Sequence, residues 1–467
     1  MKDENVRMIR NLRTSKNKYG NPRLFLEPVV LEAGNFEVGE SISYTFVKQA
    51  LIIKKADESE YKVAKRKRPS WDKYRPLIDY SNGDLAMLFG TREKIDILVS
   101  DSVIVIRKEQ SFDLCVIGQP RLESEKPLKK LTFASFPSGA GIASAALEDT
   151  GFFESKMGAD VWDPAIETYI HNFPKGSCYF GDVRSLNPGY IPSVDVAWLS
   201  PPCVSFSSLG TLSNGVIEGL GPHFARLIMA TNAKALIIEQ VPSYFSSRSF
   251  AQLKGILSPI FPYWNVRILD AFDYGSVASR KRGYAVALAD KESFEFPTMP
   301  ALPEHRRLTV GQVIGKEWEK GDWRPIKGTT MEHLLNKGGN NNFTVEKNRT
   351  LVGLDDKRIS CIIANYSKIN VTSSHLRHPD NPNFWRLFRS DELARFLDVP
   401  DYFSFPEFIS ENLRTKLLGQ SVSSNIVKAI GIELAYTLMK QRVKKAIDNR
   451  FVIPMEENSN KQLAFIL

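Results

Sequence analysis

The segment LTFASFPSGAGIASAALE, residues 131–148, decides the fold class of this chain. Residues 131–136 are an apolar run typical of a buried strand, Ser138 to Ile142 form a glycine turn, and Ala143 opens a helical pattern. A strand, a Gly-x-Gly turn and a helix in this order let the backbone approach a nucleotide cofactor closely. The third glycine of the dinucleotide pattern is missing, which disfavours a nicotinamide cofactor. We therefore expect an α/β domain with a parallel sheet and a cofactor at this turn.

Acidic residues follow the next two predicted strands. Asp160 and Asp163 lie on either side of Trp162, and Asp182 follows Gly181. Acidic residues that end the second and third strands of such a sheet can bind ribose hydroxyls and an adenine amino group. Aspartates are also common on surfaces, so the residues by themselves leave a cofactor role and a solvated position open for each.

A cysteine stands on a rigid turn after another buried strand. Residues 194–199 read VDVAWL, and Pro201 and Pro202 stop the strand directly before Cys203. The carboxyl end of a strand is where open α/β sheets hold their ligands. A buried structural cysteine is the ordinary alternative. The proline pair and the Ser-Phe-Ser at 205–207 favour a presented nucleophile instead.

Two later strands contribute charged residues. Glu239 closes the apolar run 235–238, and burying a carboxylate is costly unless it meets a partner. Arg280 and Arg282 are two residues apart, so in a strand both would lie on one face. Arginines placed there require anions or carbonyl acceptors. These residues are candidates for a polar site around the cysteine.

Residues 1–126 differ from the rest of the chain and contain an internal repeat. Segments 36–44 (FEVGESISY) and 50–55 (ALIIKK) return 53 positions later as 89–97 (FGTREKIDI) and 103–108 (VIVIRK). Each copy predicts strand, turn and strand, and no clear helix is expected in this region. A single hairpin is marginal in water, so we expect the two copies to pack on each other.

A basic segment separates the two copies. It runs from Lys62 to Arg68 and is followed by Trp71 and Tyr74. Clustered cations beside aromatic residues suit a phosphate backbone, although a charge run is more often a solvated loop. The first copy resembles the swapped-hairpin modules of AbrB-like DNA-binding proteins, in which two chains pair. A purely structural β appendage is the alternative.

Net charge, cysteine content and the length of apolar runs indicate which classes of protein and partner to expect. The 467 residues carry a formal net charge of +9, which fits an acidic partner such as nucleic acid. Four scattered cysteines without a CxxC pair argue against a disulfide framework or a zinc site and favour a reducing compartment. No apolar run approaches the roughly 20 residues that span a bilayer. We expect a cytoplasmic protein with no metal and no membrane contact.

The carboxyl-terminal part predicts an insertion and a return to the first domain. Residues 298–384 lose the α/β rhythm and contain the turn-rich stretch 338–342, as expected of a variable recognition surface. Helices are predicted from Arg386 and from Gly419 onward, and a loose tail follows. The predicted boundaries are 1–126 for the N-terminal tandem β-hairpin module, 127–297 and 385–450 for the two parts of the catalytic domain, 298–384 for the insertion and 451–467 for the tail.

The order of these motifs resembles that of the DNA cytosine-5 methyltransferases, from about Leu131 to Gly431. The resemblance implies a Rossmann-like, S-adenosylmethionine-dependent methyltransferase domain with an inserted target-recognition domain. It implies a nucleophile at Cys203, an acid at Glu239, and pocket supports at Arg280 and Arg282. The residues that it places around S-adenosylmethionine are Phe136, Gly139, Gly141, Asp160, Asp182, Pro201, Ser421 and Val422, with Asp163 as the alternative to Asp160.

Several positions depart from the family pattern. Val204, Gln240 and Gln420 replace the usual residues beside the Cys, Glu and Ser motifs, Ala278 stands at a glutamine position, and Ile142 replaces a glycine. None of them removes the thiol, the carboxylate or the arginines. We expect double-stranded DNA as partner, bound by a monomer, in a bacterial, archaeal or phage-infected cell. An RNA cytosine-5 methyltransferase and a catalytically weak DNA-binding regulator that keeps the fold are the alternatives.

Overall fold

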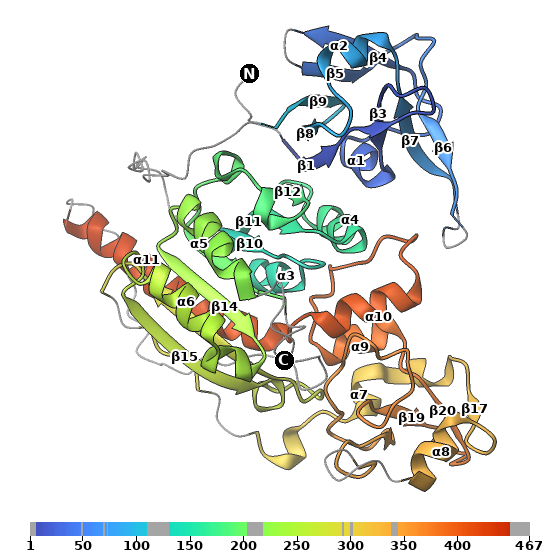
Figure 1. Ribbon diagram of the computed structural model, residues 1–467. Helices are drawn as coiled ribbons and strands as arrows, with labels where there is room; N and C mark the ends of the chain where they lie inside the picture. Colours follow the sequence, from blue (N-terminus) through green and yellow to red (C-terminus); the bar gives the residue numbers. More distant parts are fainter. Residues whose placement is uncertain are drawn as a thin grey trace.

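The computed structural model describes residues 6–47, 50–68, 71, 73–109, 130–202, 218–291, 294–298, 302–337 and 344–448. Three parts are visible in Figure 1: an N-terminal β-rich part in blue, a central α/β part, and an inserted part in yellow and orange. The predicted boundaries near residues 126 and 451 lie outside the described residues. None of the described helices is long and apolar enough to cross a membrane.

A parallel sheet forms the centre of the molecule and confirms the predicted α/β class. Its strands follow the order β15-β16-β14-β13-β10-β11-β12, and only the β14–β16 and β15–β16 pairs are antiparallel. Most of these strands are continuous apolar runs because helices cover both faces. Their bounds are β10 (Leu131–Phe136), β11 (Phe153–Asp160), β12 (Ser177–Phe180), β13 (Val196–Leu199), β14 (Ala235–Gln240), β15 (Tyr263–Asp270) and β16 (Lys281–Leu288).

Helices from both ends of the catalytic part complete the two cores. On one face α3 (Ile142–Asp149) packs against α11 (Ser424–Asp448), which returns from the far end of the chain. On the other face α5 (Gly221–Ala230) packs against α6 (Arg248–Leu257). The chain therefore leaves this domain after β16 and comes back to it through α11 (Figure 1).

The N-terminal part continues the same sheet instead of forming a separate one. Strand β1 (Met8–Arg13) pairs in parallel with β12 and antiparallel with β8, so the complete sheet has twelve strands. The predicted hairpins are present and pair with each other through β5 and β9. They are β4 (Ile42–Val47) with β5 (Ala50–Lys55), and β8 (Lys94–Ser100) with β9 (Val103–Lys108).

The repeat is longer than the sequence indicates, and the expectation of no helix is wrong. Each hairpin is preceded by a strand and a short helix, and the two preceding strands also pair. The partners Ala50–Arg107 and Lys54–Val103 exchange when either copy is shifted by the repeat length, so the copies are related by an internal two-fold. The additional elements are β3 (Pro22–Leu26) with α1 (Pro28–Ala33), and β7 (Arg75–Tyr80) with α2 (Gly83–Leu88). The AbrB-like resemblance stays a prediction.

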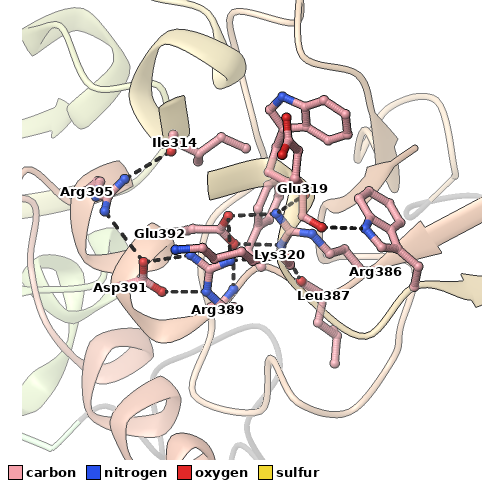
Figure 2. A network of polar contacts seen from close by, with 12 residues as sticks. Ile314, Glu319, Lys320, Arg386, Leu387, Arg389, Asp391, Glu392 and Arg395 are labelled. Atoms are coloured by element: carbon pink, nitrogen blue, oxygen red, sulfur yellow. Dashed lines mark hydrogen bonds and ion pairs between the residues drawn. The ribbon is translucent and has the colours of Figure 1, made fainter. Parts of the chain in front are cut away.

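A buried ion pair joins the inserted part to the return segment. Arg386 donates two hydrogen bonds of 2.7 Å to Glu392, and both side chains are almost fully buried (Figure 2). Arg389 and Asp391 form a more exposed pair beside them. The short elements of this region are α7 (Val310–Ile314), β17 (Arg324–Pro325), α8 (Thr330–Lys337), β18 (Leu351–Val352), β19 (His375–Arg377) and β20 (Phe384–Arg386). The chain then returns through α9 (Ser390–Phe396) and α10 (Glu411–Gln420).

Candidate active site

The carboxyl ends of the parallel strands bring the predicted site residues to one edge of the sheet. Phe136 and Asp160 end β10 and β11, Pro201 follows β13, and Glu239 lies near the end of β14. Cys203 and Val204 lie outside the described residues. The residues directly before the cysteine, Pro201 and Pro202, are described, and the description resumes at residue 218.

Glu239 is the buried carboxyl of this edge, with a relative exposure of 7%. Its Oε1 lies 3.4 Å from Nε of Arg282, and its Oε2 accepts a hydrogen bond of 3.4 Å from Oγ of Ser200. Burial raises the pKa of Glu239, while Arg282, Arg280 and Ser200 act in the opposite direction. A carboxyl in this environment binds a proton more readily than one in water. Its partner Ser200 is three residues before Cys203 in the sequence.

Gln240 connects the end of β14 to the turn that leads to the cysteine. Its buried side-chain amide donates to the carbonyl of Pro201 and accepts a hydrogen bond of 2.6 Å from the backbone N–H of Val241. The sequence identified Gln240 only as a departure from the family pattern. No periodicity or charge signal indicated that its side chain would hold the backbone of Pro201.

Arg280 and Arg282 both act on the pKa of Glu239, but they bond to different groups, an anion and carbonyls, which are the two kinds of acceptor that the sequence predicts. Arg282 lies beside Glu239, whereas the buried guanidinium of Arg280 donates to the carbonyls of Ile362 at 2.7 Å, Gly419 at 3.2 Å and Ser421. Arg280 directly precedes β16, which begins at Lys281. Arg280 therefore holds the inserted and return segments against the sheet.

The glycine turn has one open and one packed glycine. Gly139 has φ +55°, and a Cβ added there would meet no atom within 4 Å, so the outer side of its backbone is accessible. A Cβ on Gly141 would lie 2.5 Å from the ring of Phe173, so this glycine is required by packing. Phe136 is fully buried behind the turn. The open backbone at Gly139 fits a ligand that lies against the turn.

Asp160 holds the glycine turn in place. Its carboxylate accepts the backbone N–H of Gly139 at 2.9 Å and that of Trp162 at 3.0 Å, while burial raises its pKa. Burial raises the pKa of Asp163, and charged residues of the N-terminal part also act on it: Glu27 in the same direction, and Arg68 and Arg75 in the opposite direction. Of the two aspartates that the sequence left open, Asp160 is the one at the turn.

The remaining predicted cofactor residues have partners within the chain. Asp182 is half-exposed and is held by Nε of Arg184 at 2.9 Å, which lowers the pKa of the carboxyl. The hydroxyl of Ser421 donates to the carbonyl of Leu418 at 2.7 Å, and Val422 is buried in the core beneath α11. Among the described residues, no group of three or more Asp, Glu, His or Cys side chains is arranged to hold a metal.

The comparison with protein families agrees with this arrangement. The C-5 cytosine-specific DNA methylase family matches residues 131–435, which is more than half of the chain. This chain belongs to that family. Members of the family are S-adenosylmethionine-dependent methyltransferases, and this methylase shares that cofactor.

Individual relatives match to different extents. The methylase is 25% identical over 356 residues to the Type II methyltransferase M.FnuDI of Fusobacterium nucleatum, covering 66% of this chain and 96% of that protein. It is 27% identical over 191 residues to M.Bsp6I of a Bacillus strain, covering 39% of this chain and 60% of that protein. Among solved structures, the Dnmt2 methyltransferase of S. pombe aligns with a TM-score of 0.53 at 18% identity, over 67% of this chain and 99% of that one. That likeness shows a shared fold.

Proposed function

We propose that this methylase is a DNA cytosine-5 methyltransferase that acts on a cytosine flipped out of a specific duplex sequence. The observation that carries the proposal is the buried carboxyl of Glu239, which Arg282 and Ser200 hold beside the turn leading to Cys203. A buried acid next to a candidate thiol nucleophile is the pair of groups that this chemistry requires. The covalent role of Cys203 and the choice of DNA belong to the proposal.

The proposed reaction begins with Cys203. Carbon 5 of cytosine is a poor nucleophile, and addition of a thiolate to carbon 6 makes it enamine-like. The new bond joins Sγ of Cys203 to carbon 6, and the electron pair of the 5,6 double bond moves to carbon 5 or into the ring. Arg282 lies close to this turn through Glu239, and nearby positive charge favours the thiolate.

Glu239 acts on the opposite edge of the base. Its raised pKa allows the carboxyl to carry a proton, which it shares with N3 as negative charge builds on the ring. Its second oxygen can accept a hydrogen bond from the exocyclic amino group. Once carbon 5 carries the new methyl group and N3 has returned its proton to Glu239, loss of the carbon 5 proton to a base restores the 5,6 double bond and expels the Cys203 thiolate.

S-adenosylmethionine, when bound, would supply the electrophilic methyl group to which carbon 5 bonds, and the electron pair of the broken sulfur–methyl bond would stay on its sulfur. The residues that would hold it are at the glycine turn, where Gly139 exposes its backbone and Asp160 fixes the turn. Asp182 supplies a carboxylate beside them. Because carbon 5 is inaccessible within a stacked duplex, the target base must leave the stack to meet both groups.

Transfer of a labelled methyl group tests the proposal directly. The complete chain is incubated with labelled S-adenosylmethionine and either a mixed-sequence duplex or tRNA. A 5-fluorocytosine duplex then tests for the covalent adduct, because fluorine at carbon 5 prevents the elimination. We expect labelling of the duplex and a trapped complex, both of which Cys203→Ser abolishes.

Two results would contradict the proposal. Labelling of tRNA without labelling of DNA would assign the methylase to RNA. No trapped adduct in the presence of the methyl donor would instead support a DNA-binding regulator that keeps the fold. Bisulfite sequencing of DNA from a cell expressing the protein would report both the activity and the recognised sequence.

A further inference from the structure

A basic β-ribbon projects from the N-terminal part and has no place in the reaction described above. Strand β6 (Ala64–Arg66) pairs antiparallel with β7, with Lys65 opposite Pro76 and Arg66 opposite Arg75. It is an edge strand of the four-stranded sheet β2-β3-β7-β6, in which β2 (Ser15–Lys16) is the other edge. Figure 1 shows β6 at the outer side of the blue part. We call residues 62–68 with Lys73 and Tyr74 the basic ribbon.

The basic ribbon concentrates exposed cations next to one exposed aromatic ring, that of Tyr74. Tyr74 is 54% exposed, and Nζ of Lys65 and of Lys67 lie 5.0 and 5.8 Å from the centroid of its ring. Both lysines therefore lie on the side of the ribbon that carries Tyr74. Within the described part of the chain, no carboxylate forms an ion pair with the exposed cations Lys62, Lys65, Lys67 and Lys73, whereas Arg68 acts on the pKa of Asp163.

The basic ribbon is anchored, unlike a solvated loop. Arg75, at its base, is 3% exposed and pairs with Glu32 of α1 and, at 2.6 Å, with Glu167 of α4 (Asp163–Asn172). Its guanidinium also lies 4.0 Å from the ring centroid of Phe408 in the return segment. Together with the β1–β12 pairing, these contacts fix the ribbon relative to the catalytic sheet. The cations of the basic ribbon therefore have a fixed position relative to the methylase domain.

We propose that the basic ribbon is a second DNA-binding surface, which contacts the phosphate backbone of the duplex outside the flipped base. Like charges held together repel one another, and a polyanion removes that cost while releasing its own counterions. The exposed ring of Tyr74 among the cations adds contact area for sugars and bases. The choice of duplex DNA as the polyanion rests on the proposed function. The surface itself rests only on the ribbon.

A matched pair of double variants tests this surface. Lys65→Ala/Lys67→Ala removes two cations of the basic ribbon. Lys16→Ala/Lys18→Ala removes two exposed lysines at the opposite edge of the same sheet, where Lys18 also lies over an exposed tyrosine, Tyr19, at 4.8 Å. Binding of each complete chain to a fluorescent mixed-sequence duplex is measured against salt concentration. Circular dichroism verifies that the variants are folded.

The expected result is a smaller salt dependence for the ribbon variant alone. The slope of log K against log salt should fall by about 1.8, since each lost phosphate contact removes about 0.9, and affinity at 0.1 M salt should fall roughly tenfold or more. The β2-edge variant should match the wild type. Trapping on a saturating 5-fluorocytosine duplex should be the same in all three proteins.

Each other outcome has a defined meaning. An unchanged slope in the ribbon variant, or an equal fall in both variants, overturns the proposal. A fall seen with tRNA but not with duplex DNA overturns it in favour of an RNA surface. If the wild type forms no trapped adduct while the ribbon variant still loses slope on the duplex, the proposed function fails and the second DNA surface stands.

Discussion

Glu239 is a carboxyl whose burial costs free energy, and that burial also suits the acid role that we propose for it. A carboxylate at the end of an apolar strand loses most of its hydration, and the contacts of Arg282 and Ser200 compensate only part of that loss, so burial still raises its pKa. The same imbalance makes its proton available to the base in the proposed reaction. At the scale of single residues, the site is therefore defined by an acid whose environment favours protonation.

We expect Glu239→Gln to lower kcat for methyl transfer by about 10²- to 10⁴-fold, because the amide cannot donate a proton to N3. The near-isosteric change should leave the protein folded and the affinity for S-adenosylmethionine unchanged. Ser200→Ala is the control, since it removes one contact of Glu239 but not the acid, and its effect should be much smaller. Equal activity of Glu239→Gln and wild type would exclude the acid role.

A second prediction at the scale of single residues concerns Gln240. Gln240→Leu keeps the volume but loses the hydrogen bond to the carbonyl of Pro201, which should loosen the turn before Cys203. We expect the rate of adduct formation on a 5-fluorocytosine duplex to fall while DNA affinity stays the same. Gln240→Asn, which keeps the amide, should recover part of the rate. A variant that loses only thermal stability would show that Gln240 has no positioning role.

Whole elements in this molecule are joined by buried charges. The Arg386–Glu392 pair connects β20 of the inserted part to α9 of the return segment, and both partners lose almost all contact with water (Figure 2). Removing one partner of a buried pair leaves the other charge uncompensated, which costs far more than the pair contributes as a whole. A surface pair has no such asymmetry.

Glu392→Gln should therefore lower the free energy of unfolding by about 3–5 kcal/mol. Arg324→Ala, which removes the exposed pair with Asp322, should lower it by less than about 1 kcal/mol. Urea unfolding and hydrogen exchange over residues 310–396 would measure both. Similar losses in the two variants would mean that burial of the Arg386–Glu392 pair has no energetic consequence.

At the scale of the whole molecule, the N-terminal part and the catalytic part share one sheet and one buried cluster of charge. Arg75 contacts Glu32 and Glu167 at their junction. Burial raises the pKa of Glu167 to about 7, although Arg75 acts in the opposite direction. The native state therefore holds this proton more tightly than the unfolded chain, and stability from this group is lost as pH rises through 7.

Glu167→Gln should remove that dependence. The free energy of unfolding of the variant, relative to wild type, should rise between pH 5 and pH 8, because the variant has no carboxyl to ionise at the junction. Glu154→Gln is the control, since Glu154 is an exposed partner of Lys156. Urea unfolding at each pH measures the difference. A relative stability that falls with pH would show that the ionised Glu167–Arg75 pair stabilises the junction.

The sequence by itself determined the features that local patterns encode. Apolar runs, the glycine turn and the order of Cys203, Glu239 and the arginines predict a parallel sheet with its chemistry at the carboxyl ends. The described strands agree, because a strand covered on both faces must be apolar along its length. The repeat of 53 residues likewise predicts two hairpins that pair, as β5 and β9 do.

Tertiary structure alone decided which distant groups meet. The pairing of β1 with β12 joins residues about 170 positions apart, and backbone hydrogen bonds leave no signature in the side chains. Arg280 meets the carbonyl of Ile362 while Arg282 meets Glu239, and this difference depends on how the inserted segment folds back onto the sheet. Gln240, Arg75 and Glu167 gained their partners in the same way, because burial and neighbours are properties of the folded chain.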